Sequence, residues 1–241
     1  MSNATVTYRF EELVNAVNAV LPHASKDDVT PVITGIRFDA EGALAATDRY
    51  TVGAYKPEHV MVEADDAATF DGFTLDRAGC VWLSKLRVAM LSDKYLASFS
   101  VIRARVEGGM VTLSVHGTGF DPNGTHGTGF DPNGTHTFGE PSTVPEMTAS
   151  FSTISGNYPP VVRLFPDAEK LASREAMNVP VSLNTAFLIR IDKAVKAVGE
   201  RGNGVARFQF MSTDNPNKPG PVFVTVGDRF RALIQPNLLL R

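Results

Sequence analysis

Apolar residues recur at helical spacing near the start of the chain. From Phe10 to Leu21 they fall on one face of an α-helix, and Pro22 follows the end of the pattern. Glu11 and Glu12 lie in the first turn, where negative charge suits the helix dipole. Runs of β-forming residues come next, and we expect strands at 32–38, 42–47 and 51–55.

The same order of one helix followed by strands recurs in the middle of the chain. We expect a short strand at 73–75 and a helix at 83–91, whose apolar side carries Leu86, Met90 and Leu91. The later strands of this second unit are expected at 98–106, 110–115 and 149–154.

A third unit occupies the last quarter of the chain. We expect a strand at 179–183 and a helix at 185–198, with Asn184 as its N-cap. The residues expected to face inward from this helix are apolar: Phe187, Leu188, Ile191, Ala194, Val195 and Val198. Strands are expected to follow at 206–210, 222–226 and 230–234.

The order of elements predicts an α+β fold made of three repeated units, near residues 5–60, 70–166 and 170–241. A doubly wound sheet is excluded, because strands here follow one another without intervening helices.

The charged residues of the helix at 185–198 fall opposite its apolar face, at Arg190, Lys193 and Lys196. A basic face of this kind either contacts an anionic partner or only keeps the helix soluble. The residues expected to face outward from the first helix carry no positive charge: Glu11, Glu12, Asn15 and Asn18.

The composition is that of a globular protein with a substantial core. The 241 residues are 43% hydrophobic and 20% charged, with a formal net charge of −3. This charge excludes a uniformly basic nucleic-acid binder but allows a basic face on an acidic body. Because neither an apolar leader nor a membrane-spanning run is seen, we expect a cytoplasmic protein without membrane contact.

A perfect ten-residue repeat interrupts the second unit. Residues 117–126 read GTGFDPNGTH, and residues 127–136 repeat the same letters. Glycine, Asp-Pro and Asn-Gly favour turns, so we expect a surface loop between strands. A calcium-binding glycine/aspartate repeat is the alternative, although its aspartate spacing matches no calcium motif.

Enzymatic motifs are missing from the chain. The single cysteine, Cys80, lies among apolar residues and is expected to be a buried structural thiol. The histidines lack the spacing of metal ligands, which leaves a loop site at His116, His126 and His136 as a weaker alternative. We therefore expect a non-enzymatic protein with no metal and no cofactor.

Three segments carry a resemblance to a known family. Residues 30–55 read TPVITGIRFDAEGALAATDRYTVGAY, residues 158–166 read YPPVVRLFP, and residues 230–237 read FRALIQPN. In this order they resemble the bacterial DNA polymerase III beta sliding clamp family. The resemblance covers about residues 8–116 and 149–240.

The resemblance implies a DNA-clamp fold of repeated half-units, each a helix plus antiparallel strands, with the helices inside and the sheets outside. We expect a clamp domain of two half-units at 1–166 and a C-terminal half-unit at 167–241. Such a chain would be a shortened clamp, and its reduced size suggests that a phage encodes it. A ring of about twelve half-units, the number of the family, would need about four copies, so we expect a homo-oligomer, with a tetramer as the state that this arithmetic gives.

The function implied is that of a processivity factor. The ring would encircle double-stranded DNA without regard to sequence and would tether DNA polymerase and clamp loader peptides in a groove. The residues expected to contact DNA are basic: Lys85, Arg87, Lys94, Arg190, Lys193, Lys196 and Arg201. The residues carried over from the peptide groove of the family come from all three segments: Thr47, Arg49, Tyr50, Thr51, Val52, Pro159, Leu164, Leu233, Gln235, Pro236 and Asn237.

Two alternatives stay open. A clamp-like regulatory or peptide-binding module would keep the groove without encircling DNA, as the small number of half-units and the weakly basic first helix suggest. A small-molecule enzyme on an α+β scaffold is the other, for which no catalytic set is found.

Overall fold

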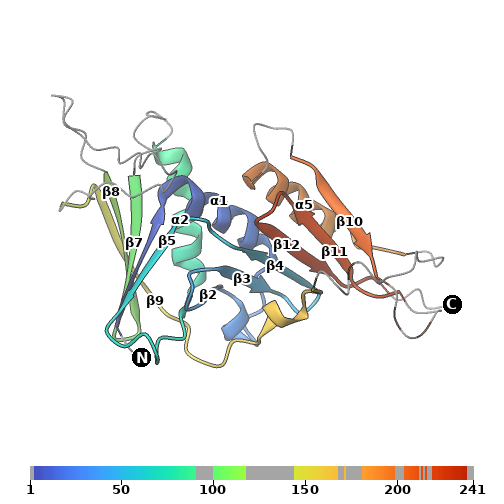
Figure 1. Cartoon of the computed structure of the whole chain (residues 1–241), viewed down its shortest axis with the longest axis horizontal. Helices are drawn as coiled ribbons and strands as arrows, with labels where there is room; N and C mark the ends of the chain where they lie inside the picture. Colours follow the sequence, from blue (N-terminus) through green and yellow to red (C-terminus); the bar gives the residue numbers. More distant parts are fainter. Residues whose placement is uncertain are drawn as a thin grey trace.

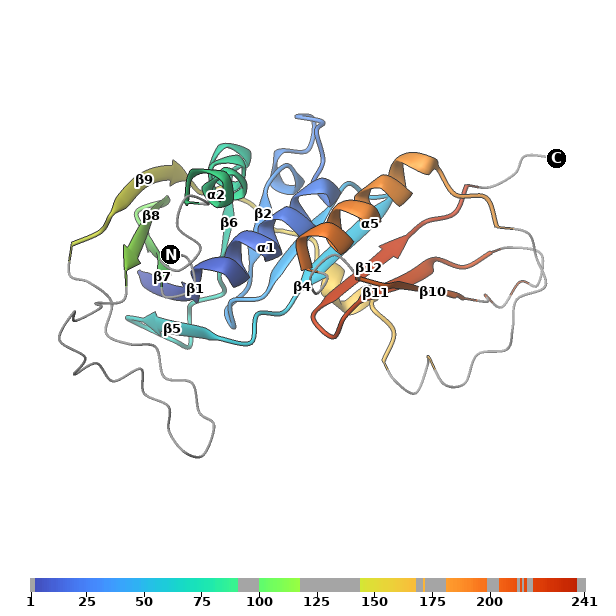
Figure 2. The ribbon, with the colours of Figure 1, turned by 90° about the horizontal axis from the view of Figure 1, so that it is seen from above.

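The computed structural model describes residues 3–90, 100–117, 144–167, 171, 181–198, 204–211, 213, 215 and 219–237. Within these residues the chain forms two antiparallel sheets and three α-helices. Helix α1 (Phe10–Val20) lies between α2 (Arg77–Met90) and α5 (Thr185–Val198) (Figures 1 and 2). The fold therefore has a layer of helices against a layer of sheet.

The first unit contains more strands than its sequence predicts. The observed strands are β1 (Ala4–Arg9), β2 (Ile36–Phe38), β3 (Leu44–Thr47), β4 (Thr51–Tyr55) and β5 (Val60–Ala64). Short 3-10 helices at Leu21–His23 and Pro31–Ile33 lie between α1 and β2. Strands β1 and β5 were not expected. The letters of β1, ATVTYR, alternate apolar and polar residues, and Ala4, Val6 and Tyr8 are buried, so the period of a strand was present in the sequence and was missed.

The second and third units follow the expected order. The strands of the second unit are β6 (Phe73–Leu75), β7 (Ser100–Glu107), β8 (Met110–Gly117) and β9 (Met147–Ser152). A 3-10 helix at Val161–Leu164 follows them. The strands of the third unit are β10 (Ala206–Phe210), β11 (Val222–Val226) and β12 (Phe230–Ile234). The duplicated segment lies almost entirely outside the described residues.

Strands from different units mix in both sheets. The five-stranded sheet has the order β5-β1-β7-β8-β9, and the seven-stranded sheet has the order β10-β11-β12-β4-β3-β2-β6. Strand β12 pairs with β4 so that Ala232 lies opposite Gly53. The third unit therefore extends the sheet of the first, and the domain boundary between residues 166 and 167 stays a prediction.

Helix α2 begins at Arg77 rather than at residue 83, so its predicted start was wrong. The Oδ1 atom of Asp76 accepts a hydrogen bond of 2.7 Å from the backbone N–H of Gly79, which caps the helix. Gly79 packs against Leu75, where an added Cβ would lie 2.7 Å from a leucine methyl group. This glycine obscures the helical pattern in the sequence but allows the close packing.

Helix α5 has the predicted bounds and the predicted cap. The Oδ1 atom of Asn184 accepts a hydrogen bond of 2.9 Å from Ala186 N–H. Leu188 was expected to face inward but is 39% exposed, whereas Ala197 is buried. The reason is that α5 buries only the side that meets α1 and the sheet. The strand expected at 179–183 is reduced, in the described residues, to a single bridge between Ser182 and Asn237.

Glu12 also differs from its predicted outward position. Its side chain is buried, and its carboxylate accepts hydrogen bonds from the backbone N–H of Glu58, at 2.6 Å, and from Arg229, at 2.8 Å. These bonds connect α1 to the residues that follow β4 and to the turn between β11 and β12. A carboxylate needs such partners when it is removed from water.

Two apolar clusters stabilise the fold. The larger one lies between the helices and both sheets and contains the inward faces of all three helices. The smaller one, which we call the outer apolar cluster, lies on the other face of the seven-stranded sheet. Its buried members are Ile33, Ala45, Val52, Ala54, Tyr158, Val161, Met211, Phe223 and Leu233.

His23 is fully buried at the end of α1. Its ring lies 5.9 Å from that of Phe230 and against Gly53, where an added Cβ would lie 2.5 Å from the histidine Cδ2. Within the described part of the chain neither ring nitrogen has a hydrogen-bond partner. Burial, together with the nearby Arg190 guanidinium, lowers the pKa of His23 from 6.5 to about 3, although Asp48 opposes this shift.

We expect His23 to make the protein less stable in acid. Below pH 6.5 the unfolded chain binds a proton that the folded chain rejects until the pH nears 3. The free energy of unfolding should therefore fall across this window by up to about 1.4 kcal/mol per pH unit. Urea unfolding of the protein and of His23→Leu over this range measures the contribution of His23. An equal slope in both proteins would contradict it.

Candidate functional site

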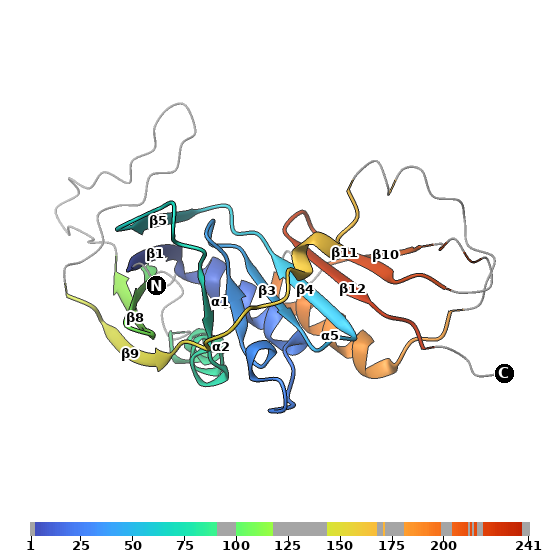
Figure 3. The same cartoon turned by 90° about the horizontal axis from the view of Figure 1, so that it is seen from below.

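Three segments that are far apart in the chain meet at the outer apolar cluster. Val52 of β4 lies opposite Leu233 of β12 in the sheet, and both side chains are 6% exposed. The segment that contains Tyr158 crosses the same face of the sheet, seen from below in Figure 3. Its Tyr158 hydroxyl donates a hydrogen bond of 3.4 Å to the carbonyl oxygen of Ala45. The structure thus brings together the segments that carry the sequence resemblance.

Exposed apolar side chains border this cluster. Leu164 is 62% exposed at the end of the 3-10 helix, and Tyr50 is 63% exposed at the turn between β3 and β4. The ring of Phe165 lies between that of Phe223, at 6.2 Å, and the guanidinium of Arg231, at 5.0 Å. An apolar surface of this kind suits a partner that buries apolar side chains on it.

The predicted groove residues divide by exposure. Side chains that are buried belong to Thr47, Thr51, Val52, Leu233 and Pro236. Side chains that are exposed belong to Arg49, Tyr50, Leu164, Gln235 and Asn237, and Pro159 is half-buried. The buried threonines act within the turn and are not available to a partner.

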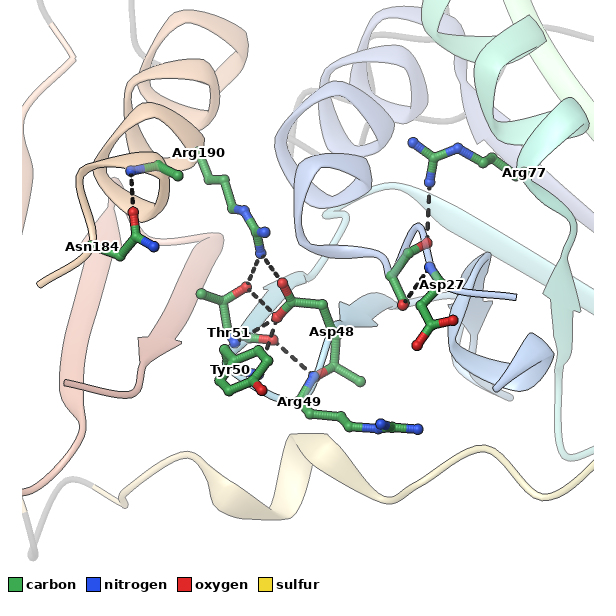
Figure 4. A network of polar contacts seen from close by, with 11 residues as sticks. Asp27, Asp48, Arg49, Tyr50, Thr51, Arg77, Asn184 and Arg190 are labelled. Carbon is green, nitrogen blue, oxygen red and sulfur yellow. Dashed lines mark hydrogen bonds and ion pairs between the residues drawn. The ribbon is translucent and has the colours of Figure 1, made fainter. Parts of the chain in front are cut away.

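The turn between β3 and β4 is held by its own side chains (Figure 4). The Oδ1 atom of Asp48 accepts hydrogen bonds from Tyr50 N–H at 3.1 Å and from Thr51 N–H at 2.8 Å. The Thr47 hydroxyl donates to the Thr51 carbonyl oxygen at 2.8 Å. Arg49 has a φ of +77°, a left-handed conformation that these bonds maintain. Asp48 is therefore a turn residue and not a candidate general acid or base.

A basic cleft lies on the helix side of the same turn. It has a volume of about 1000 Å³ and is bounded by α2, α5 and the end of α1. The cations among its lining residues are Lys26, Arg49, Arg77, Arg190, Lys193 and Lys196. Among the described residues, two carboxylates line the cleft, those of Asp27 and Asp48. The excess of positive charge suits a polyanion such as a nucleic-acid backbone.

The residues predicted to contact DNA differ in their surroundings. Lys193 is exposed in the cleft, and Lys196 is exposed but forms an ion pair of 2.7 Å with Asp192. Arg190 is largely buried and paired with Asp48 at 2.6 Å. Lys85 is exposed on α2. The remaining predicted positions cannot be placed, because the Arg87 side chain, Lys94 and Arg201 lie outside the described residues.

Lys26 and Arg77 also line the cleft, although neither was among the residues predicted to contact DNA. Arg77 lies before the predicted start of α2, and Lys26 lies in the loop after α1. Arg77 donates a hydrogen bond of 3.3 Å to the Ser25 carbonyl oxygen, which holds the two segments together. An earlier helix start, signalled by the capping Asp76, would have placed Arg77 on α2.

A second cleft, of about 720 Å³, lies at the N-terminal end of α1. Its lining includes the cations of Arg9, Arg207 and Arg229 and the carboxylates of Glu11, Glu12, Glu58 and Asp228. Because positive and negative groups are nearly balanced, this cleft is less suited to a polyanion than the first.

Among the described residues, no three or more histidine, cysteine, aspartate or glutamate side chains are grouped so that they could hold a metal ion. Burial raises the pKa of the Cys80 thiol to about 12, so this cysteine is a poor nucleophile. None of the described helices has the length and apolar character needed to cross a membrane.

No protein-family model matches the chain. A beta sliding clamp of Streptomyces coelicolor is 39% identical over 71 residues, which are 27% of this chain and 19% of that protein. Among solved structures, the Helicobacter pylori beta clamp bound to a DNA ligase peptide is 12% identical with a TM-score of 0.61, over 98% of this chain and 66% of that one. DNA polymerase III subunit beta of Borrelia burgdorferi is 11% identical with a TM-score of 0.59, over 98% and 64%.

These similarities confirm the α+β clamp fold that the sequence predicts, together with the resemblance to the beta sliding clamps. The chain spans about two thirds of the length of these solved structures.

Proposed function

Because the chain has the fold of the bacterial beta sliding clamps, we propose that it is a DNA sliding clamp that encircles duplex DNA and tethers replication proteins. The mechanism is topological and involves no catalysis. A closed ring cannot leave duplex DNA sideways, so a tethered polymerase stays at high effective concentration near its substrate.

The observation that supports this proposal most directly is the meeting of the three segments at the outer apolar cluster. Val52, Leu164 and Leu233 come from distant parts of the sequence and form or border one surface. A short partner peptide would bury apolar side chains there, while the exposed polar groups of the turn fix its register. The solved Helicobacter pylori clamp is bound to a peptide of DNA ligase, and we assign polymerase and clamp loader peptides to the surface of this chain.

The basic cleft would contact the DNA. Exposed lysines attract phosphate groups without reading the bases, and this kind of contact lets a protein slide along the duplex. Lys26 and Lys193 are the exposed cations that we assign to this role.

Ring closure would need several copies of the chain. Within the described residues β9 and β10 each end a sheet, and an unpaired edge is a site for strand pairing. We propose a closed homo-oligomer of about four chains, since three units per chain would then give about twelve in the ring.

A clamp-like module that binds peptides without encircling DNA is the second candidate. It is favoured by the neutralisation of two predicted DNA contacts, because Arg190 pairs with Asp48 and Lys196 pairs with Asp192. A measurement of DNA binding by the isolated protein distinguishes the two candidate functions.

We expect the protein to bind duplex DNA weakly and with a strong dependence on salt. Changing Lys26 and Lys193 together to alanine should reduce the slope of log affinity against log salt by about 2. The reason is that each lysine–phosphate contact releases about one counterion from the DNA, and the double variant loses two such contacts. Fluorescence anisotropy with duplexes of different sequence measures this slope. Arg207→Ala is the control, since Arg207 is an exposed cation on β10 and lies outside the basic cleft. If the double variant keeps the original slope, Lys26 and Lys193 do not contact the DNA, and the basic cleft is not its binding site.

We expect a short polymerase-derived peptide with apolar and aromatic residues to bind with micromolar affinity, about −8 kcal/mol. Leu164→Asp should weaken this binding by several kcal/mol, because it places a carboxylate against the apolar surface. Leu164 is exposed, so the variant should keep its melting temperature. Met61→Asp, on the exposed face of β5, is the control. Unchanged peptide binding by a folded Leu164→Asp protein would rule out this surface.

We expect a discrete oligomer in solution, with a mass about four times that of the monomer. Light scattering coupled to size-exclusion chromatography measures this mass. A purely monomeric protein, or a continuum of sizes, would argue against a closed ring and for the module that does not encircle DNA.

A further inference from the structure

Arg190 is not placed like a cation that waits for a phosphate group. Its side chain is only 20% exposed, and its guanidinium lies 2.6 Å from the Asp48 carboxylate, which is 14% exposed. The same guanidinium nitrogen donates a hydrogen bond to the Thr51 hydroxyl. A charge that is already paired and partly removed from water gains little from a further anion.

The partners of Arg190 belong to the turn that borders the outer apolar cluster. Asp48 and Thr51 lie in the turn between β3 and β4, whereas Arg190 extends to them from α5 on the helix side (Figure 4). The Thr51 hydroxyl in turn donates to Asp48 at 3.1 Å. One arginine thus connects the third unit to a turn of the first unit.

The other side of this turn carries residues of the proposed peptide surface. The carbonyl oxygen of Tyr50 accepts a hydrogen bond of 2.9 Å from Gln235 N–H, just after β12. Val52, two residues after Tyr50, lies opposite Leu233. Any shift of the turn would therefore move Tyr50 and Val52 together, along with the strand end at Gln235.

We propose that Arg190 and Asp48 form a positioning pair for the peptide surface, and that Arg190 is not a DNA contact. This inference rests on the proposed peptide binding. The pair holds the turn from the helix side, so that the left-handed Arg49 and the exposed Tyr50 keep the position in which a peptide meets them. A preorganised surface binds more tightly because less ordering is needed on association.

The first test compares two substitutions on one helix. Arg190→Met keeps an unbranched apolar stem and removes the guanidinium with its charge. It should weaken binding of a fluorescein-labelled polymerase-derived peptide roughly tenfold, through lost preorganisation. It should leave the salt slope of DNA binding unchanged. Lys193→Met, one turn along α5, should lower that slope by about 0.9. A lower DNA slope with full peptide affinity in Arg190→Met would overturn the inference.

A variant that only lowers the stability of the protein could also bind peptide more weakly, so this effect needs its own control. Tyr8→Phe removes a buried hydrogen bond of 3.1 Å to the Gly42 carbonyl oxygen, at a site that lies outside the turn and the outer apolar cluster. This variant should lower the melting temperature and keep full peptide affinity. If it weakens peptide binding as much as Arg190→Met does, the pair has only a structural role.

The second test examines the pair itself. Asp48→Asn retains an oxygen for the turn hydrogen bonds but removes the charge that Arg190 meets. Each single variant should weaken peptide binding, and the double variant should be little worse than either, because both remove one interaction. Arg190→Lys should restore part of the affinity. Additive losses in the double variant would contradict a shared role.

Failure of the inference is distinguishable from failure of the proposed function. If the unmodified protein binds no peptide, the proposed function itself is wrong. If it binds peptide and Arg190→Met binds equally well, only the positioning role is wrong.

Discussion

The antiparallel pairing of β4 with β12 is the contact on which the rest of the structure depends. It joins strands from opposite ends of the chain, so that the first and third units share one seven-stranded sheet. Gly53 lies at the middle of this ladder, and only a glycine leaves room there for the buried ring of His23. Helices α1 and α5 then lie side by side over the joined strands (Figure 2).

This one sheet has two different faces that carry the two proposed activities. Its helix side leads to the basic cleft, and its other side carries the outer apolar cluster. The residues from Asp48 to Val52 reach both sides, because Asp48 contacts Arg190 and Tyr50 lines the basic cleft on the helix side, while Val52 belongs to the outer apolar cluster. A single short turn therefore connects the surface proposed for DNA with the surface proposed for peptides.

Local patterns explain which elements were predictable. Strand β4, helix α5 and strand β12 were predicted with their observed bounds, because each has a clear period and recognisable ends. Strand β1 carries the alternation of a half-buried strand, with Ala4, Val6 and Tyr8 buried, but it is short and runs directly into the stronger helical pattern of α1, so it was missed. The burial of Glu12 was missed because its partner Arg229 lies near the other end of the chain.

For the candidate site, the resemblance in the sequence predicted which segments form the surface and in what order they occur along the chain. The residues around Val52, Tyr158 and Leu233 were identified without coordinates, and the fold brings them to one surface. The contacts of the individual side chains there depend on the three-dimensional structure. Arg190 lies on the polar face of its helix, as its spacing predicts, yet pairing with Asp48 makes it part of the turn. A helical period reports the direction of a side chain but not the charge it meets, because that charge comes from a distant segment brought close by folding.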